Sequence, residues 1–169
     1  IKSNKFILGE QVYKLEKKLS KYVGSKHCTT TSSGTDALLI ALMSLNLKKG
    51  SEVITPAFSY ISSAEVILRL GFKPVFVDID PDTALINIKK IEKKITNRTS
   101  CIIVVSLFGQ IPDVKELLRI KKKYNLPIIE DAAQSFGAKY KNKKSCNIFD
   151  IGCTSFFPTK SLGCFGDGG

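Results

Sequence analysis

The stretch Cys101-Ile102-Ile103-Val104-Val105 decides the fold class, because it is apolar at every position and rich in β-branched residues. A strand with water on one face alternates apolar and polar residues, so this stretch is expected to be buried on both faces. Strands of that kind belong to parallel sheets that helices cover on both sides. The sequence therefore predicts an α/β fold with three layers (α/β/α) and a doubly wound parallel sheet.

Helix and strand patterns alternate along the rest of the chain. Apolar residues at helical spacing predict helices, and short apolar runs that end at Pro, Gly or acidic residues predict strands. The expected helices cover about 10–22, 37–45, 59–70, 88–95 and 114–124, and the expected strands 28–32, 52–55, 74–77, 101–105, 127–129 and 151–157. Because no repeat, low-complexity stretch or linker interrupts the pattern, we expect a single domain over residues 1–169.

The composition is that of a globular protein with an excess of positive charge. Of 169 residues, 43% are hydrophobic and 24% are charged, which excludes a disordered tail, a collagen-like rod and a membrane bundle. The net charge of +11 can indicate a nucleic-acid or membrane-surface partner. However, the basic residues are 23 Lys and only 3 Arg, and they are scattered. We interpret them as a solvated surface and expect no nucleic-acid or membrane partner.

Several sequence features are absent, and their absence narrows the classes of function that the chain could have. No apolar run approaches the roughly 20 residues of a spanning helix, and no charged-then-apolar leader opens the chain, which favours a cytoplasmic location. The five cysteines form no CxxC pair and the single histidine is His27, so neither a metal site nor a disulfide framework is expected. No GxSxG, P-loop or GxGxxG motif occurs.

Lys160 differs from the other lysines in its sequence neighbourhood. It is the only charged residue between Ile151 and Gly166, and Phe156, Phe157, Leu162 and Phe165 are close to it in sequence. An ammonium in apolar surroundings loses hydration, so the neutral amine that Schiff-base chemistry needs becomes accessible. A lysine that snorkels from a surface loop explains the pattern equally well.

Three other features are each weak evidence for a ligand-binding site when they are taken alone. Asp131 ends an apolar run, at the strand end where α/β sheets place ligands, but it could be a helix N-cap. The run Ser32–Thr35 precedes an apolar helix and could bind a phosphate or simply cap that helix. Tyr60 could stack on a planar ring or belong to the core. Together with Lys160, these residues match the needs of one cofactor, pyridoxal 5′-phosphate (PLP).

The chain resembles the DegT/DnrJ/EryC1/StrS family of PLP-dependent sugar aminotransferases, which is related to aspartate aminotransferase. The resemblance covers about residues 6–169 and rests on long stretches in a fixed order. They are FILGEQVYKLEKKLSKYVGSKHC, SSGTDALLIAL, GSEVITPAFSY, GFKPVFVDIDPDT, VSLFGQ, IIEDAAQSFGA and GCTSFFPTKSLGCFGDGG. It implies the PLP-dependent transferase fold of type I, with residues 1–169 as the N-terminal part of the large PLP-binding domain. The rest of that domain and a small C-terminal domain would be absent.

The resemblance also implies a role for each site residue. Lys160 matches the Schiff-base lysine, Asp131 the partner of the pyridine nitrogen, and Gln134 the residue near the phenolic oxygen. Gly34, Thr35 and Ser155 match the phosphate-binding residues, and Tyr60 matches the ring-stacking aromatic. Thr154 departs from the family, since many relatives have an apolar residue there. Lys160 argues against the dehydratases of this family, in which histidine replaces the lysine.

The implied activity is transfer of the amino group of L-glutamate to a nucleotide-linked keto sugar for surface polysaccharides such as lipopolysaccharide O-antigen. The resemblance is closest to enzymes that aminate UDP-2-acetamido-2-deoxy-3-oxo-glucuronate. Enzymes that act on GDP-, dTDP- or UDP-linked 4-keto sugars, and a non-catalytic relative, remain alternatives. The family implies a homodimer with shared active sites, so we expect a chain of residues 1–169 alone to be inactive.

Overall fold

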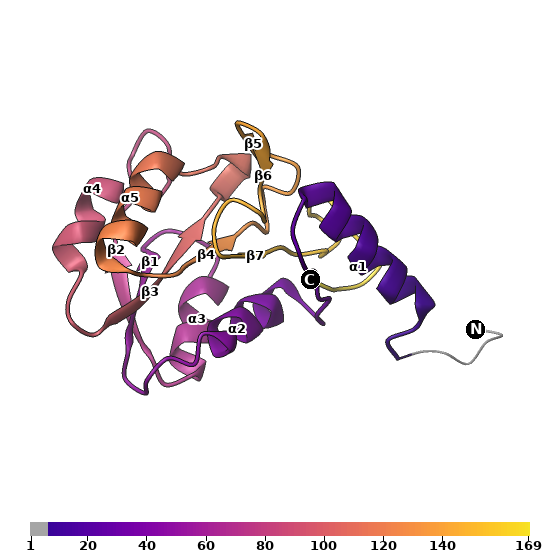
Figure 1. Ribbon diagram of the computed structural model, residues 1–169, viewed down its shortest axis with the longest axis horizontal. Coiled ribbons are helices and arrows are strands. Elements are labelled where there is room, and N and C mark those ends of the chain that lie inside the picture. Colours follow the sequence, from indigo (N-terminus) through magenta and orange to yellow (C-terminus); the bar gives the residue numbers. More distant parts are fainter. Residues whose placement is uncertain (1–6) are drawn as a thin grey trace.

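The computed structural model describes residues 7–169, and its centre is a parallel five-stranded sheet (Figure 1). The strands lie in the spatial order β2-β1-β3-β4-β7, and every neighbouring pair is parallel. They are β1 (Glu52–Pro56), β2 (Lys73–Val77), β3 (Thr99–Val105), β4 (Ile128–Asp131) and β7 (Ile151–Cys153). The predicted parallel sheet is confirmed, and the stretch Cys101–Val105 forms most of its central strand.

Helices cover both faces of this sheet, as expected. The helices are α1 (Glu10–Val23), α2 (Gly34–Ser44), α3 (Ser62–Arg69), α4 (Ile88–Ile91) and α5 (Val114–Tyr124), with 3-10 turns η1 (Glu92–Lys94) and η2 (Leu107–Gly109). Ile103 packs with α2 and α3 in one apolar cluster, whereas Ile102 and Val104 pack with α4 and α5 in another. All three are fully buried. The alternation along β3 therefore builds a three-layer α/β/α structure, while α1 lies to one side of the layers (Figure 1).

Some element bounds differ from the sequence predictions. α3 begins at Ser62, not at residue 59, because residues 57–61 form the loop between β1 and the helix. β7 stops at Cys153, and residues 154–169 are irregular. Residues 28–32 form no strand, although Thr31 exchanges two backbone hydrogen bonds with Gly169, at 2.8 and 3.1 Å. A short hairpin, β5 (Lys139–Tyr140) and β6 (Lys143–Lys144), was not predicted.

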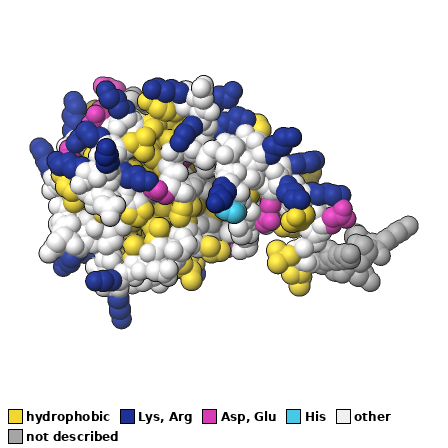
Figure 2. All heavy atoms as spheres, in the orientation of Figure 1, with side chains coloured by type: hydrophobic (Ala, Val, Ile, Leu, Met, Phe, Trp, Pro, Cys, Tyr) yellow, Lys and Arg dark blue, Asp and Glu magenta, His cyan; other side chains and the backbone are white. Residues whose placement is uncertain are grey.

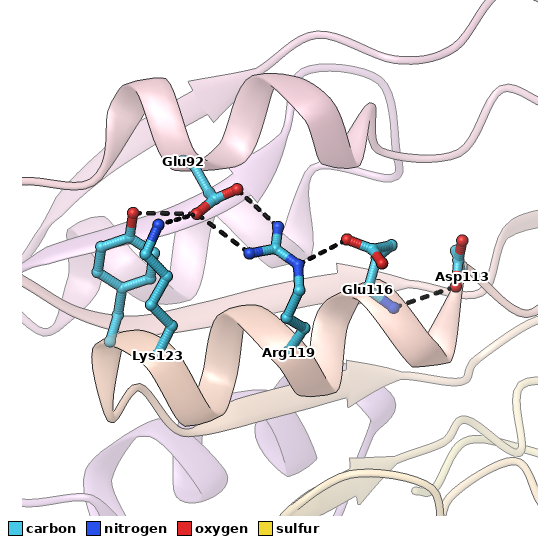
Figure 3. Close-up of polar contacts among 6 residues, drawn as sticks. Glu92, Asp113, Glu116, Arg119 and Lys123 are labelled. Carbon is cyan, nitrogen blue, oxygen red and sulfur yellow. Dashed lines mark hydrogen bonds and ion pairs between the residues drawn. The ribbon is translucent and has the colours of Figure 1, made fainter.

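The surface charge is distributed over the molecule. Figure 2 shows Lys and Arg side chains along α1 and over much of the remaining face, with few acidic side chains. Some of this charge is paired: Glu92 accepts hydrogen bonds from Arg119, Lys123 and Tyr124, which joins η1 to α5 (Figure 3). These contacts, the Arg119 contact foremost, lower the pKa of Glu92 to about 2. None of the helices that the structure describes is both long and apolar enough to cross a membrane.

Candidate active site

A cavity of about 340 Å³ lies at the carboxyl end of the sheet, beside the N-termini of α2 and α3. Val105 and Asp131, the last residues of β3 and β4, line it together with Ser62 from α3. All seven site residues predicted from the sequence line this one cavity: Gly34, Thr35, Tyr60, Asp131, Gln134, Ser155 and Lys160. Parallel strands place their carboxyl ends at one edge, which explains how segments far apart in sequence meet here.

One side of the cavity is built to receive an anion. The Ser33 hydroxyl caps α2 by accepting from Asp36 N at 3.0 Å. Among residues 7–169, no group accepts from the N–H groups of Gly34 and Thr35 in the first turn. Ser155 packs so closely that a Cβ on Gly34 would lie 2.7 Å from the Ser155 Cβ. A helix N-terminus with free N–H groups and adjacent hydroxyls binds phosphate well.

Asp131 is a buried carboxylate whose two oxygens each accept one hydrogen bond. Ala133 N donates to Oδ1 at 3.1 Å, and the Ser63 hydroxyl donates to Oδ2 at 3.0 Å. Burial raises the pKa of Asp131, while the two donors and the Lys160 ammonium oppose that rise. Asp131 belongs to β4, so its expected place at a strand end is confirmed and no helix follows for it to cap.

Lys160 lines the same cavity, and the structure shows how its apolar sequence neighbours lie. The side chains of Phe157 and Leu162 are 47% and 39% exposed, and Phe165 is fully exposed. Only Phe156 of the expected apolar neighbours is buried. These residues therefore form no closed apolar shell around Lys160, although Phe157 lines the same cavity. Tight backbone turns, with Lys160 N donating to Phe157 O at 2.8 Å, direct those side chains outward.

Gln134 has a defined orientation that the sequence does not reveal. Its side-chain oxygen accepts from the backbone N–H of Phe108 at 2.9 Å. Because an N–H can only donate, the amide nitrogen of Gln134 remains available to donate elsewhere. Phe108 adopts the left-handed region, with φ 55° and ψ 27°, to make this contact. A non-glycine residue there costs about 1–2 kcal/mol, so the loop is strained next to the cavity.

Glu130 lies beside Asp131 in β4 and forms a separate buried network. Its carboxylate accepts from the Ser106 and Ser145 hydroxyls, at 2.8 and 2.7 Å, and from Cys146 N at 2.9 Å. Burial raises the pKa of Glu130, and these donors partly offset that effect. The network ties the end of β3 and the segment after β6 to β4. Glu130 was not singled out from the sequence, because its partners lie 24 and 15 residues away.

A comparison with known protein families shows to which family the chain belongs. The DegT/DnrJ/EryC1/StrS aminotransferase family matches residues 1–169. The chain belongs to this family. The resemblance stated from the sequence is thus confirmed, as is the fold class, since solved family members share the α/β architecture with high structural similarity.

Three proteins to which this chain is similar illustrate the range of its relatives. The UDP-2-acetamido-2-deoxy-3-oxo-D-glucuronate aminotransferase of Pseudomonas aeruginosa is 52% identical over all of this chain and 47% of its own length. The GDP-perosamine synthase of Caulobacter vibrioides is 40% identical over 96% of this chain and 43% of its own. The structure of NtdA from Bacillus subtilis, with bound cofactor PMP, has a TM-score of 0.91 and 38% identity, covering 99% and 38% of the two chains. This chain therefore spans about half the length of the curated relatives it matches.

The donors around the cavity fit the cofactor of this family on observations made within the structure. The Ser59 hydroxyl oxygen is buried at the cavity and has no hydrogen-bond partner among the described residues. It can therefore form a hydrogen bond with a ligand in the cavity. An amine, a buried carboxylate and the first turn of α2 with its free N–H groups also line the space. PLP needs one group of each kind. No three His, Cys, Asp or Glu side chains within residues 7–169 form a metal-binding group.

Proposed function

We propose that the protein is a PLP-dependent aminotransferase that moves the amino group of L-glutamate to a nucleotide-linked keto sugar. The observation that carries this proposal is that Lys160 and Asp131 line one cavity with the anion-binding first turn of α2. An amine, a carboxylate and the N–H groups of a helix terminus thus surround a space of about 340 Å³, which supports binding of a phosphate-bearing cofactor there. We further propose a cytoplasmic homodimer with shared active sites.

The residues present would hold the cofactor at its two ends. The N–H groups of Gly34 and Thr35 and the hydroxyl of Ser155 would bind the phosphate. Asp131 would accept a hydrogen bond from the ring nitrogen and keep a proton on it, and Gln134 would donate its free amide N–H to the phenolic oxygen. Tyr60, which is 71% exposed on the rim, would stack on the ring.

Lys160 carries the covalent and proton-transfer chemistry of the proposal. When bound, PLP supplies an aldehyde that condenses with amines and a ring that withdraws electrons from the adjacent carbon. Lys160 Nζ would attach the group, be displaced by the amine of L-glutamate, and then accept the proton of the glutamate α-carbon. The same nitrogen would return a proton to carbon when the amino group moves to the keto sugar.

The preferred sugar substrate is UDP-2-acetamido-2-deoxy-3-oxo-glucuronate, for surface polysaccharides such as lipopolysaccharide O-antigen. Its support is the 52% identity to an aminotransferase named for that sugar. The alternative is a 4-keto sugar, supported by 40% identity to a GDP-perosamine synthase. Side-by-side assays of UDP-, GDP- and dTDP-linked keto sugars with the full-length protein separate the two. Faster turnover of a GDP-linked 4-keto sugar would overturn the preferred assignment.

The first experiment is the visible absorption spectrum of the full-length protein with PLP, before and after L-glutamate is added. We expect a visible band that disappears with glutamate, and we expect ping-pong kinetics with the sugar. Lys160→Ala should abolish turnover and the covalent band but retain non-covalent PLP binding, whereas the control Lys122→Ala on α5 should behave as the unsubstituted protein. A fully active Lys160→Ala variant, or no band in the unsubstituted protein, would refute the proposal.

A further inference from the structure

α3 begins with two adjacent serines whose hydroxyls contact two residues of the cavity lining, Thr35 and Asp131. Ser62 and Ser63 are only 5% and 2% exposed. The Ser62 hydroxyl lies 2.6 Å from the Thr35 hydroxyl on α2, and the Ser63 hydroxyl donates to Asp131 Oδ2 at 3.0 Å. Successive helical residues point about 100° apart, so one turn of helix reaches both α2 and β4.

Ser63 fixes the plane of the Asp131 carboxylate. An ionised carboxylate can only accept, so the Ser63 hydroxyl must donate. With Ala133 N on the other oxygen, each Asp131 oxygen has one protein donor and keeps a lone pair for a further partner. Both donors favour the ionised form and oppose the rise in the pKa of Asp131 that burial causes. Without the Ser63 hydroxyl, Asp131 holds its own proton more tightly and is freer to rotate.

Ser62 controls a different group, the hydroxyl of Thr35. Two hydroxyls in contact share one proton in their hydrogen bond, whichever of them donates. The second proton of the pair is left for a third acceptor, and both residues line the cavity. An anion beside Thr35 would be that acceptor. Ser62 therefore orients the Thr35 hydroxyl and leaves the pair as a donor at the phosphate end.

We propose that Ser62 and Ser63 are positioning residues that set the two ends of the cofactor site from the first turn of α3. Ser62 acts through Thr35 on the phosphate, and Ser63 acts through Asp131 on the ring nitrogen. This inference rests on the proposed function, because it requires PLP in the cavity. It assigns roles to two residues outside the set named from the sequence.

The test uses the full-length protein and two readouts that do not depend on turnover. The first is the dissociation constant of PLP compared with that of pyridoxal, which lacks the phosphate. The second is the nitrogen NMR chemical shift of bound PLP labelled with ¹⁵N in the ring, which reports whether the ring nitrogen carries a proton. Circular dichroism and thermal unfolding confirm that each variant is folded.

The alanine variants of the two serines should each change a different readout. We expect Ser62→Ala to weaken PLP binding about tenfold, because the Thr35 hydroxyl loses the partner that orients it toward the phosphate, and to leave pyridoxal binding and the ¹⁵N shift unchanged. We expect Ser63→Ala to move the ¹⁵N shift toward that of unprotonated pyridine and to affect PLP and pyridoxal binding equally. The threonine variants at both positions keep the hydroxyl and should restore each readout.

The control is Ser100→Ala, which removes a partly buried, hydrogen-bonded hydroxyl of the sheet. Ser100 lies near the amino end of β3, away from the cavity, and both readouts should be unchanged. If the unsubstituted protein binds PLP and neither alanine variant differs from it, the inference is wrong and the proposed function stands. If the unsubstituted protein does not bind PLP, both are wrong.

Discussion

Replacing Gly34 by alanine tests whether the close approach of α2 and Ser155 shapes the site. A Cβ at position 34 would lie 2.7 Å from the Ser155 Cβ, 3.2 Å from its Oγ and 3.3 Å from its Cα. Relaxed carbon contacts are about 3.5–4.0 Å, so the two segments would have to separate by about 1 Å. Overpacking of this kind costs about 1–3 kcal/mol.

The same substitution would also stabilise the helix, and this gain offsets part of the packing cost. Alanine is favoured over glycine within helices by about 1 kcal/mol, and by less in the first turn. The net loss in the free energy of unfolding should therefore be about 1–2 kcal/mol. Because both segments bind the proposed phosphate, we also expect weaker PLP binding, measured by titration beside urea denaturation of the full-length protein.

A double variant distinguishes the steric cause from a general disturbance. Ser155→Gly removes the Cβ and Oγ that alanine at position 34 would contact. Gly34→Ala and Ser155→Gly combined should therefore destabilise the protein by less than the sum of the single changes, with a coupling of about 1 kcal/mol. PLP binding should stay weak, since the Ser155 hydroxyl is absent. Additive effects on stability, or unchanged stability in Gly34→Ala alone, would refute the steric argument.

Two further predictions concern carboxylates outside the cavity. Glu130→Ala leaves the Ser106 hydroxyl, the Ser145 hydroxyl and Cys146 N without their acceptor and should lower the free energy of unfolding by at least about 2 kcal/mol. An unchanged urea midpoint in Glu130→Ala would contradict the stabilising role of the Glu130 carboxylate. Glu92 has a pKa lowered to about 2 in the folded state, so it stabilises the fold above its ordinary pKa of 4.5. That contribution is lost as the pH falls from about 4.5 to 2, and Glu92→Gln should flatten the acid side of the stability profile. An identical pH dependence of the unfolding midpoint in the two proteins would show that the network in Figure 3 contributes nothing.

The sequence predicts the sheet well because its strands are defined by local pattern. Cys101–Val105 is apolar throughout, and a run of that kind has no alternative to burial on both faces. The sequence left open whether apolar residues enclose Lys160, and the structure shows that they do not. Nearby apolar residues in the sequence do not enclose a side chain when tight turns direct them to solvent, as Phe157 and Phe165 show.

The features of the site that could not be predicted are contacts between segments that lie far apart in the sequence. The family resemblance names Asp131, and that residue does line the cavity. It does not name Ser63, which lies 68 residues earlier and meets Asp131 only through the packing of α3 on the sheet. The contact between Phe108 N and Gln134 is similar, because a backbone N–H in a left-handed turn leaves no signature in the side chains.

The spatial order of the strands also bears on how the molecule is made. After β1 and β2 pair, β3, β4 and β7 each add to the same growing edge in the order in which they are synthesised. The 68 residues between Ser63 and Asp131 take a ribosome about 3–14 s, so the Ser63 hydroxyl lacks its Asp131 partner during that time. Lys160 emerges later still. We therefore expect the sheet, β7 included, to assemble before any cofactor can be captured, and its assembly should not depend on whether the cofactor is supplied.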